Sequence, residues 1–201
     1  MKKLAISICL ILVLLFSGCS ENISIEKNEF PLKANEVSAI LSENNTNWYI
    51  EKTEVLSDKL TAMIVYSDNE NEFRNNGENP TQAEKAVGAV AFYNSDDGQR
   101  IAFQYLTFRP NMDTFQTILP KSIDICCDMY SVNAADNILK DISNINLNID
   151  IDYSYWYKEY GSVYAWLQYK VERGKMIPIA FSINDEGAHN IMLQQIGYNT
   201  K

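Results

Sequence analysis

The chain has 201 residues, 46% of them hydrophobic, with 17 basic and 26 acidic residues and a formal charge of −9. A chain of this length can bury one sizeable hydrophobic core or two small ones. The acidic balance argues against nucleic acids and anionic lipid headgroups as direct ligands, because like charges repel. With four cysteines, the sequence is also not a disulfide-rich scaffold.

Residues 1–18 have the three regions of a secretory signal peptide. Lys2 and Lys3 form a basic start, residues 4–16 are almost wholly apolar, and the small residues Ser17 and Gly18 follow. At ~1.5 Å per residue, the apolar segment spans about 20 Å, well short of the roughly 30 Å hydrocarbon core of a bilayer. We therefore predict a cleaved leader and not a membrane-spanning helix.

The end of this leader, Leu15-Phe16-Ser17-Gly18-Cys19, resembles the lipobox of bacterial lipoproteins, in which an aliphatic residue and two small residues precede an invariant cysteine. The resemblance implies that Cys19 is acylated and becomes the first residue of the mature chain. The sequence departs from the pattern at Phe16, where leucine is usual, and the alternative is an ordinary signal peptide with an incidental cysteine. Acyl chains contribute about 0.8 kcal/mol per buried methylene, so several chains on Cys19 would anchor the protein firmly. We therefore expect a protein anchored by lipid to the cell membrane and facing outside the cytoplasm.

Residues 19–35 are polar, lack periodicity and contain Pro31, which favours a lipidated N-terminus followed by a tether. Loss of Lys2 and Lys3 with the leader makes the mature charge −11. Abundant Asn, Ile, Lys and Tyr are typical of an AT-rich bacterial genome and, with the lipobox resemblance, indicate a Gram-positive source.

Residues 36–110 are predicted to form a first α+β unit. Val37, Ile40 and Leu41 recur at three- and four-residue spacing, which indicates an amphipathic helix over 33–45. Segments rich in β-branched and aromatic residues then predict four strands, at 46–56, 59–67, 85–94 and 99–109. Residues 67–85 carry few apolar side chains and are expected to form a long loop, in which Asp68, Glu70 and Glu72 are interpreted as solvated charge.

Residues 111–201 are predicted to repeat this plan as a second α+β unit. Two helices are expected, at 120–130 and 134–145, followed by four strands at 148–158, 162–171, 175–184 and 188–198. The junctions "EYG", "ERG" and "DEG" (159–161, 172–174 and 185–187) each fit a three-residue hairpin loop that ends on a left-handed glycine. The fold predicted is thus α+β, with two tandem units of helix plus four-stranded antiparallel sheet.

A three-residue loop at 159–161 sets the register of the hairpin that contains it. Lys158 then faces Ser162, and Tyr157 lies opposite Val163 on a continuous apolar face. On the other, mostly polar face, this register places Trp156 opposite Tyr164, with Trp166 two positions along the same strand. Trp156, Tyr164 and Trp166 form a candidate contact surface, since aromatic residues with a polar rim are typical of protein interfaces. The alternative is that a helix or the first unit buries this cluster.

Other reactive side chains are interpreted as structural. Cys126 and Cys127 are adjacent on a predicted helix and lack the C-x-x-C spacing of redox and zinc sites, so buried thiols are expected. His189, the only histidine, is expected on the inner face of the last strand without a nucleophile motif. The acidic runs at 68–72 and 148–152 do not match the calcium-loop pattern, so no metal and no cofactor is expected.

Two functions from different classes remain. The first is a non-enzymatic lipoprotein that binds a protein, a peptide or a small ligand through Trp156, Tyr164 and Trp166. The second is a cell-envelope hydrolase with a carboxylate site that the sequence does not locate. The order of predicted elements is similar to that of tandem helix-plus-sheet inhibitors and PepSY-type modules, and this resemblance in order alone favours the first.

Overall fold

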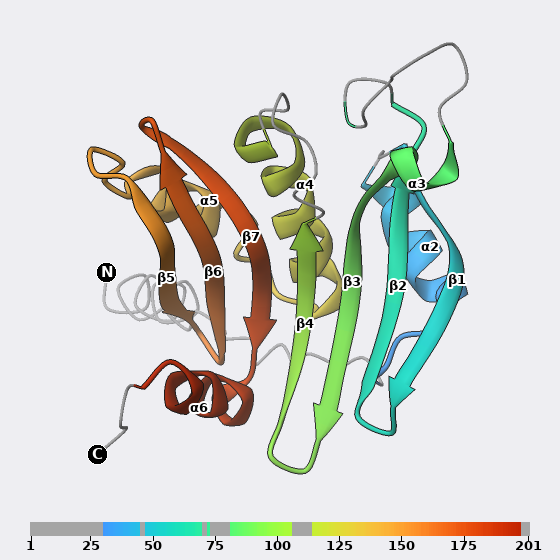
Figure 1. Ribbon diagram of the computed structural model, residues 1–201. Coiled ribbons are helices and arrows are strands. Elements are labelled where there is room, and N and C mark those ends of the chain that lie inside the picture. The colour runs from blue at the N-terminus through green and yellow to red at the C-terminus, as the bar shows by residue number, and fades with distance from the viewer. Residues whose placement is uncertain (1–29, 45–46, 70–71, 73–80, 106–113, 198–201) are drawn as a thin grey trace, which may run out of the picture.

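Alternating apolar residues along the chain produce a seven-stranded antiparallel sheet, with helices packed mainly on one of its faces (Figure 1). The computed structural model describes residues 30–44, 47–69, 72, 81–105 and 114–197. The strands are β1 (Trp48–Ser57), β2 (Leu60–Ser67), β3 (Ala86–Ser95), β4 (Gly98–Tyr105), β5 (Ile151–Tyr160), β6 (Val163–Glu172) and β7 (Lys175–Asn184). The helices are α2 (Ala34–Glu43), α3 (Gln82–Lys85), α4 (Thr114–Met129), α5 (Ala135–Ser143) and α6 (Glu186–Gln195).

The strand order β1-β2-β3-β4-β7-β6-β5 joins two meanders through the β4–β7 pair. Strands β1 to β4 form the first meander and β5 to β7 the second, so segments about 80 residues apart in sequence become neighbours, as the pairing of Phe103 with Phe181 shows. Because β4 and β7 are antiparallel and hydrogen-bonded, the two halves of the chain share one continuous sheet.

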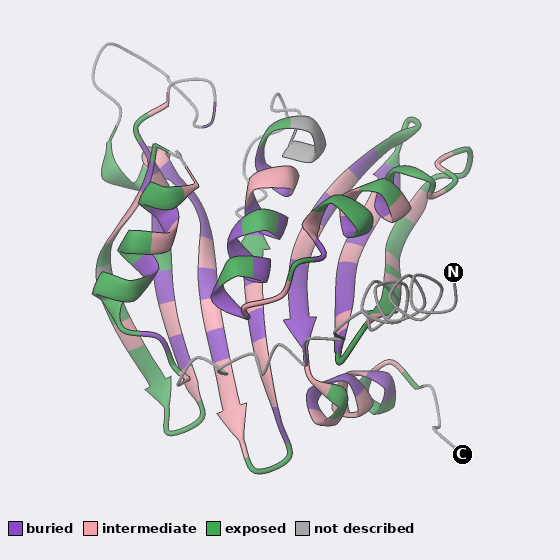
Figure 2. Ribbon diagram, turned by 180° about the vertical axis from the view of Figure 1, so that it is seen from behind, coloured by how far each residue is buried: buried purple, intermediate pink, exposed green. Residues whose placement is uncertain are grey.

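The inner face of the sheet carries the core. Helices α2, α4 and α5 cover this face and are seen in front of the strands in Figure 2. Val90, Phe103, Phe181 and Leu167 lie in register across four neighbouring strands and are almost completely buried. Each such side chain contributes about 1.5–3 kcal/mol by leaving water, so this row is a main source of the fold's stability.

The α+β class predicted from sequence is confirmed, and the predicted helices and the first seven predicted strands overlap the observed ones. The predicted helix at 120–130 begins earlier, so that Pro120 lies inside α4. The predicted leader, Cys19 and the predicted boundary between residues 110 and 111 lie outside the described residues. Within the described part of the chain, no helix is both long and apolar enough to cross a membrane.

The strand predicted at 188–198 is wrong, because residues 186–195 form helix α6. The "DEG" junction is the start of this helix and not a hairpin loop. The carboxylate of Asp185 accepts a hydrogen bond from the backbone N–H of Ala188 at 2.9 Å, which makes Asp185 the N-cap residue. Glu186 in the first turn adds a favourable charge at the positive end of the helix. Residues 114–197 therefore contribute three strands to the sheet, where four were predicted for this part of the chain.

The three-residue loops predicted at 159–161 and 172–174 are also wrong; at the second, Glu172 pairs with Lys175 around a two-residue turn. Tyr160 pairs with Val163, so Gly161 and Ser162 form a two-residue turn. Gly161 has a φ of 64°, as expected for glycine at the first central position of a type II′ turn. This shifts the register, and Tyr157 lies opposite Trp166 where the three-residue loop would have placed Val163.

Candidate functional site

The outer face of the sheet lies opposite α2, α4 and α5, and these helices leave it uncovered (Figures 1 and 2). Strands β2, β3, β4 and β7 present small side chains on this face. We call this set the alanine strip; its members are Ala62, Ala89, Ala91, Ala102, Ala180 and Ser182. Three strand spacings of ~4.8 Å make the strip about 14 Å wide from β2 to β7.

Aromatic rings flank the alanine strip on both sides. Tyr49 and Tyr66 stack at 5.6 Å near the β1 edge. A larger group lies toward the β5 edge and contains the four aromatic residues Tyr155, Tyr157, Tyr164 and Trp166 together with His189 of α6. We call this group the aromatic–histidine cluster. It brings together two neighbouring strands and a helix that begins fourteen residues after β6 ends.

Ring contacts hold this cluster in one arrangement. Tyr157 stacks on Trp166 with the ring centroids 4.7 Å apart, and Tyr164 stacks on His189 at 3.8 Å. Tyr155 meets Trp166 edge-on at 6.4 Å. Trp166 is only 1% exposed, whereas Tyr155 and Tyr157 are about 40% exposed. Trp166 is thus the buried support, and the two tyrosines present ring surface to the solvent.

His189 links helix α6 to the sheet. The indole N–H of Trp166 donates a hydrogen bond to Nδ1 of His189 at 2.9 Å, so the neutral ring carries its proton on Nε2. Burial lowers the pKa of His189, and the charges of Glu159 and Glu186 oppose this shift without cancelling it. The imidazole is therefore neutral at pH 7. In this state its Nδ1 can accept the hydrogen bond on which the geometry of the cluster depends.

The three aromatic residues predicted from sequence do not share a face. Tyr164 and Trp166 lie on the outer face, as members of the aromatic–histidine cluster. Trp156 pairs with Leu167 and packs against the core on the inner face. The error follows from the turn at Gly161, because an odd change in the sum of paired residue numbers moves one strand's side chains to the opposite face.

Sequence reasoning missed Tyr155, Tyr157 and His189 as partners of Trp166. A two-residue Gly-Ser turn would have placed Tyr157 opposite Trp166, and this dipeptide is a recognised hairpin signal. His189 had no comparable signal, because its place depends on how α6 docks. Gly98 and Gly187 make this docking possible: a Cβ at Gly98 would collide with the backbone N of Ala188, and one at Gly187 with the carbonyl oxygen of Asp97.

Arg100 lies on the same face, two residues before Ala102 on β4, just beyond this end of the alanine strip. It pairs with Asn184 on β7 and with Tyr93 on β3, and its guanidinium lies 5.9 Å from the ring centroid of Tyr93. In cross-strand order, the row Tyr93, Arg100, Asn184 and Tyr164 leads from the cation to the aromatic–histidine cluster. The outer face therefore combines small, aromatic and cationic groups.

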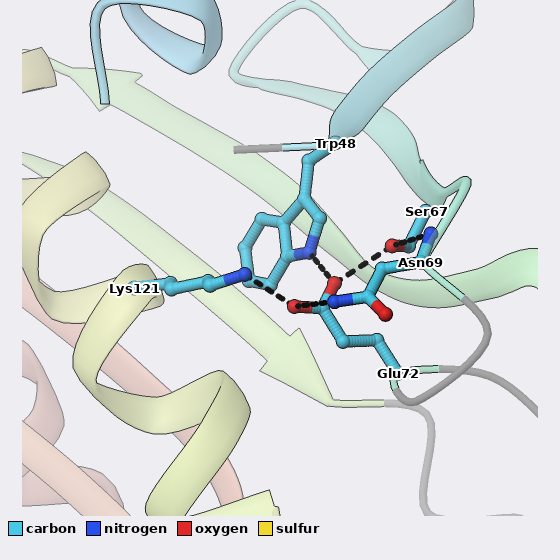
Figure 3. A network of polar contacts seen from close by, with 5 residues as sticks. All are labelled: Trp48, Ser67, Asn69, Glu72 and Lys121. Atoms are coloured by element: carbon cyan, nitrogen blue, oxygen red, sulfur yellow. Dashed lines mark hydrogen bonds and ion pairs between the residues drawn. The ribbon is translucent and has the colours of Figure 1, made fainter. Parts of the chain in front are cut away.

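A second polar centre, around Glu72, lies near the opposite end of the strands (Figure 3). Its carboxylate accepts hydrogen bonds from Trp48 Nε1 at 2.5 Å and from Ser67 Oγ at 2.7 Å, and it forms an ion pair with Lys121 of α4. Burial alone would raise the pKa of Glu72, but the hydrogen bonds and the charge of Lys121 outweigh it and hold the pKa below its ordinary value. Glu72 was interpreted from sequence as solvated, whereas its side chain is 3% exposed. Glu72 thus links Trp48 of β1 and Ser67 of β2 to Lys121 of α4.

An acidic pocket of about 650 Å³ lies on the helical side of the molecule, between α2, α4 and the start of α5. Asp124, Asp128 and Asp136 line it, and burial together with the other two charges raises the pKa of Asp124. Within residues 30–44, 47–69, 72, 81–105 and 114–197, no group of three His, Cys, Asp or Glu side chains is arranged to hold a metal ion. Nothing in this pocket points to a particular ligand.

The adjacent thiols of α4 are buried and unpaired, as predicted. Burial raises the pKa of Cys126, and it raises that of Cys127 to about 12, so both are protonated at neutral pH. Neither thiol is thus suited to nucleophilic chemistry.

No family model matches this chain, and neither a curated protein nor a solved structure is significantly similar to it. The outer face is therefore interpreted from its own geometry.

Proposed function

We propose that this chain is an extracytoplasmic, lipid-anchored binding protein that holds a polypeptide partner on the outer face of its sheet. The observation that carries the proposal is the aromatic–histidine cluster. Within this cluster, a buried hydrogen bond fixes Trp166 and His189, and the rings of Tyr155 and Tyr157 remain accessible to solvent. Rigid tyrosine rings supply contact area at low entropic cost, which is why they are enriched in protein interfaces.

The shape of the surface favours a polypeptide over a small molecule. Small-molecule sites are enclosed pockets, whereas the alanine strip is a broad sheet surface between two sets of aromatic rings. A width of about 14 Å accommodates an extended chain or a helix, whose diameter is about 10–12 Å. The acidic chain disfavours nucleic acid and anionic lipid as the occupant. Arg100 offers a complementary charge to an acidic segment.

Anchoring rests on the lipobox resemblance at Cys19. The proposed location is the outer side of a bacterial cell membrane, in a Gram-positive organism. The tether predicted at 19–35 ends earlier than expected, because Leu32 is buried and α2 begins at Ala34. From Cys19 to Phe30 the chain has eleven steps of at most about 3.6 Å, so Phe30, where the described fold begins, can lie up to about 40 Å from the membrane. This reach allows contact with a polypeptide that lies in or near the envelope.

The test is capture of envelope proteins by the full-length protein in detergent, tagged after Lys201. We compare the wild type with Tyr157→Ser, which removes an accessible ring, and with Ala102→Arg, which places a long charged side chain in the alanine strip. The matched control is Leu56→Ser, an exposed residue of β1 at the other edge of the sheet. We expect the two outer-face variants to lose at least about nine-tenths of the captured partner and the control to lose none.

Chemical class is tested by treating the envelope fraction with a protease before capture. Loss of the captured species after proteolysis supports a polypeptide partner. The proposal is wrong if the captured species survives proteolysis, or if Tyr157→Ser and Ala102→Arg retain as much of it as the wild type does. Thermal unfolding of each variant confirms that the comparison is made between folded proteins.

A further inference from the structure

Among the residues that the structure describes, Arg100 has no counter-ion. The ion pairs seen there involve lysines, among them Lys85, Lys121, Lys158 and Lys170, and no described carboxylate lies at ion-pair distance from the Arg100 guanidinium. The guanidinium of Arg100 lies over the ring of Tyr93, with 5.9 Å between its central carbon and the ring centroid. The arginine is nevertheless half-buried, and burial lowers its pKa from the ordinary value. A half-buried charge that lacks a partner is costly in a folded protein and is therefore informative.

Asn184 lies directly opposite Arg100 on β7 and is held in place by two hydrogen bonds. Its side-chain N–H groups donate to the carbonyl oxygen of Tyr164 at 3.1 Å and to Ser182 Oγ at 3.0 Å. Asn184 is 0% exposed, so a bound chain cannot reach its side chain and the ligand-accessible group of this pair is the guanidinium of Arg100. A peptide supplies the charge that this cation lacks, as a side-chain carboxylate.

Helix α6 packs close to the start of β4, near Arg100. Gly98 lies two residues before Arg100 on β4 and therefore faces the same side of the sheet. The first turn of α6 occupies the space that a side chain at Gly98 would take. Arg100 itself is half-buried, so a carboxylate bound there would interact more strongly than on a fully open surface.

We infer that Arg100 is the subsite for a carboxylate of the bound polypeptide, supplied by a glutamate or aspartate side chain. The inference rests on the proposed function for the identity of the partner. The planar guanidinium suits two parallel hydrogen bonds to a carboxylate. The row from Arg100 through Asn184 to Tyr164 then places the acidic residue beside the aromatic–histidine cluster. The partner segment is thus expected to combine an acidic residue with apolar or aromatic neighbours.

The test uses a defined probe, so it does not depend on isolating the partner. N-acetyl-L-glutamic acid α-amide is titrated into the ¹⁵N-labelled full-length protein in detergent, at constant ionic strength, and compared with the neutral N-acetyl-L-glutamine amide. The signals followed are Arg100 Nε–H, the side-chain amide of Asn184 and the backbone amide of Gly98. We expect saturable shifts with a millimolar Kd for the acidic probe, and affinity at least about tenfold weaker for the neutral one.

Two variants separate this subsite from general charge attraction. Arg100→Gln is expected to weaken binding of the acidic probe at least about tenfold, as read at Asn184 and Gly98, and Arg100→Lys is expected to restore part of it. Arg173→Gln, at the exposed β6–β7 turn, is the control and is expected to bind like the wild type. Unsaturated shifts, equal shifts with both probes, or an unchanged affinity in Arg100→Gln would each overturn the inference. Tighter saturable binding of inorganic phosphate at Arg100 would overturn the assignment to a carboxylate.

This experiment and the capture experiment fail independently. If Arg100→Gln captures the envelope partner as well as the wild type while Tyr157→Ser does not, the proposed function stands and the carboxylate subsite is wrong. If the probe binds at Arg100 but the outer-face variants capture normally, the polypeptide-binding proposal is wrong and only a carboxylate site remains.

Discussion

Replacing Lys121 with methionine tests the buried carboxylate of Glu72. Methionine keeps an apolar stem near Trp48, over which the Lys121 ammonium lies at 5.8 Å, and it removes the ammonium group that forms an ion pair with Glu72. The side chain of Glu72 is 3% exposed, so its carboxylate cannot turn to water in the folded state. Removal of one partner of such a pair costs about 3–5 kcal/mol.

Protonation limits this cost. A carboxyl group with an ordinary pKa of 4.5 can take up a proton at pH 7 at a cost of about 1.4 kcal/mol per pH unit, or about 3.4 kcal/mol in all. We therefore expect Lys121→Met to lose about 3 kcal/mol at pH 7. Glu72→Gln should lose only about 1–2 kcal/mol, because the amide oxygen still accepts from Trp48 and Ser67 and because Lys121, 32% exposed, can reach solvent.

The pH dependence of stability distinguishes the wild type from Lys121→Met by its sign. In the wild type the folded-state pKa of Glu72 is lowered, so its contribution is fully present above the unfolded pKa of 4.5 and is lost as pH falls through the folded pKa. In Lys121→Met the folded-state pKa is expected above 4.5, so the folded state binds more protons. The variant's stability should then fall as pH rises from 5 to 7, whereas that of the wild type stays nearly level with respect to this group.

The assay is urea unfolding followed by tryptophan fluorescence at pH 5 and pH 7. Lys158→Met is the control, since Lys158 and Asp141 form an exposed pair that is expected to contribute little. A loss below about 1 kcal/mol at pH 7 in Lys121→Met, or the same loss at both pH values, would contradict a buried Glu72 that depends on Lys121.

Four further predictions concern the cluster, the helix docked beside it and the anchor. Because burial lowers the pKa of His189, its contribution to stability should be present above the unfolded pKa of 6.5 and be lost as pH falls through 6.5 toward the folded pKa. His189→Phe should remove this part of the pH dependence of Tm, and an unchanged pH dependence would contradict the lowered pKa. Trp166→Phe should lower the stability by about 1–3 kcal/mol, because Nδ1 of His189 loses its donor, and should impair partner capture. Trp156→Phe should leave capture intact, since Trp156 lies on the inner face; equal capture by both variants would contradict their placement on opposite faces. Gly187→Ala should speed amide hydrogen exchange throughout α6, because its Cβ meets the carbonyl of Asp97, and unchanged exchange would argue against this close approach. Gln194→Ala, at an exposed position of the same helix, is the control. Labelling of cells with a palmitate analogue should mark the wild type and not Cys19→Ser, and equal labelling of both would exclude this anchor.

Local patterns in the sequence determined much of the secondary structure. Three- and four-residue spacing of Val37, Ile40 and Leu41 predicted α2, and β-branched and aromatic segments predicted all seven strands. These features follow from the 3.6- and 2-residue periods of helix and strand, which neighbouring residues express without help from distant ones. The leader and the lipobox resemblance at Cys19 are likewise local, and they stay predictions.

The faces of the sheet and the composition of the site were decided by tertiary structure. One residue of difference in the turn at Gly161 moved Trp156 to the core and left Tyr164 and Trp166 outside, because strand side chains alternate with a period of two. The place of His189 depends on the packing of α6 against Gly98, and the burial of Glu72 depends on Lys121, 49 residues away. The β4–β7 pairing puts Arg100 opposite Asn184, 84 positions apart in the chain, and thereby brings Arg100 to the same face as the aromatic–histidine cluster. Contacts between residues so far apart are selected by the packing energy of the whole fold, which no local pattern contains.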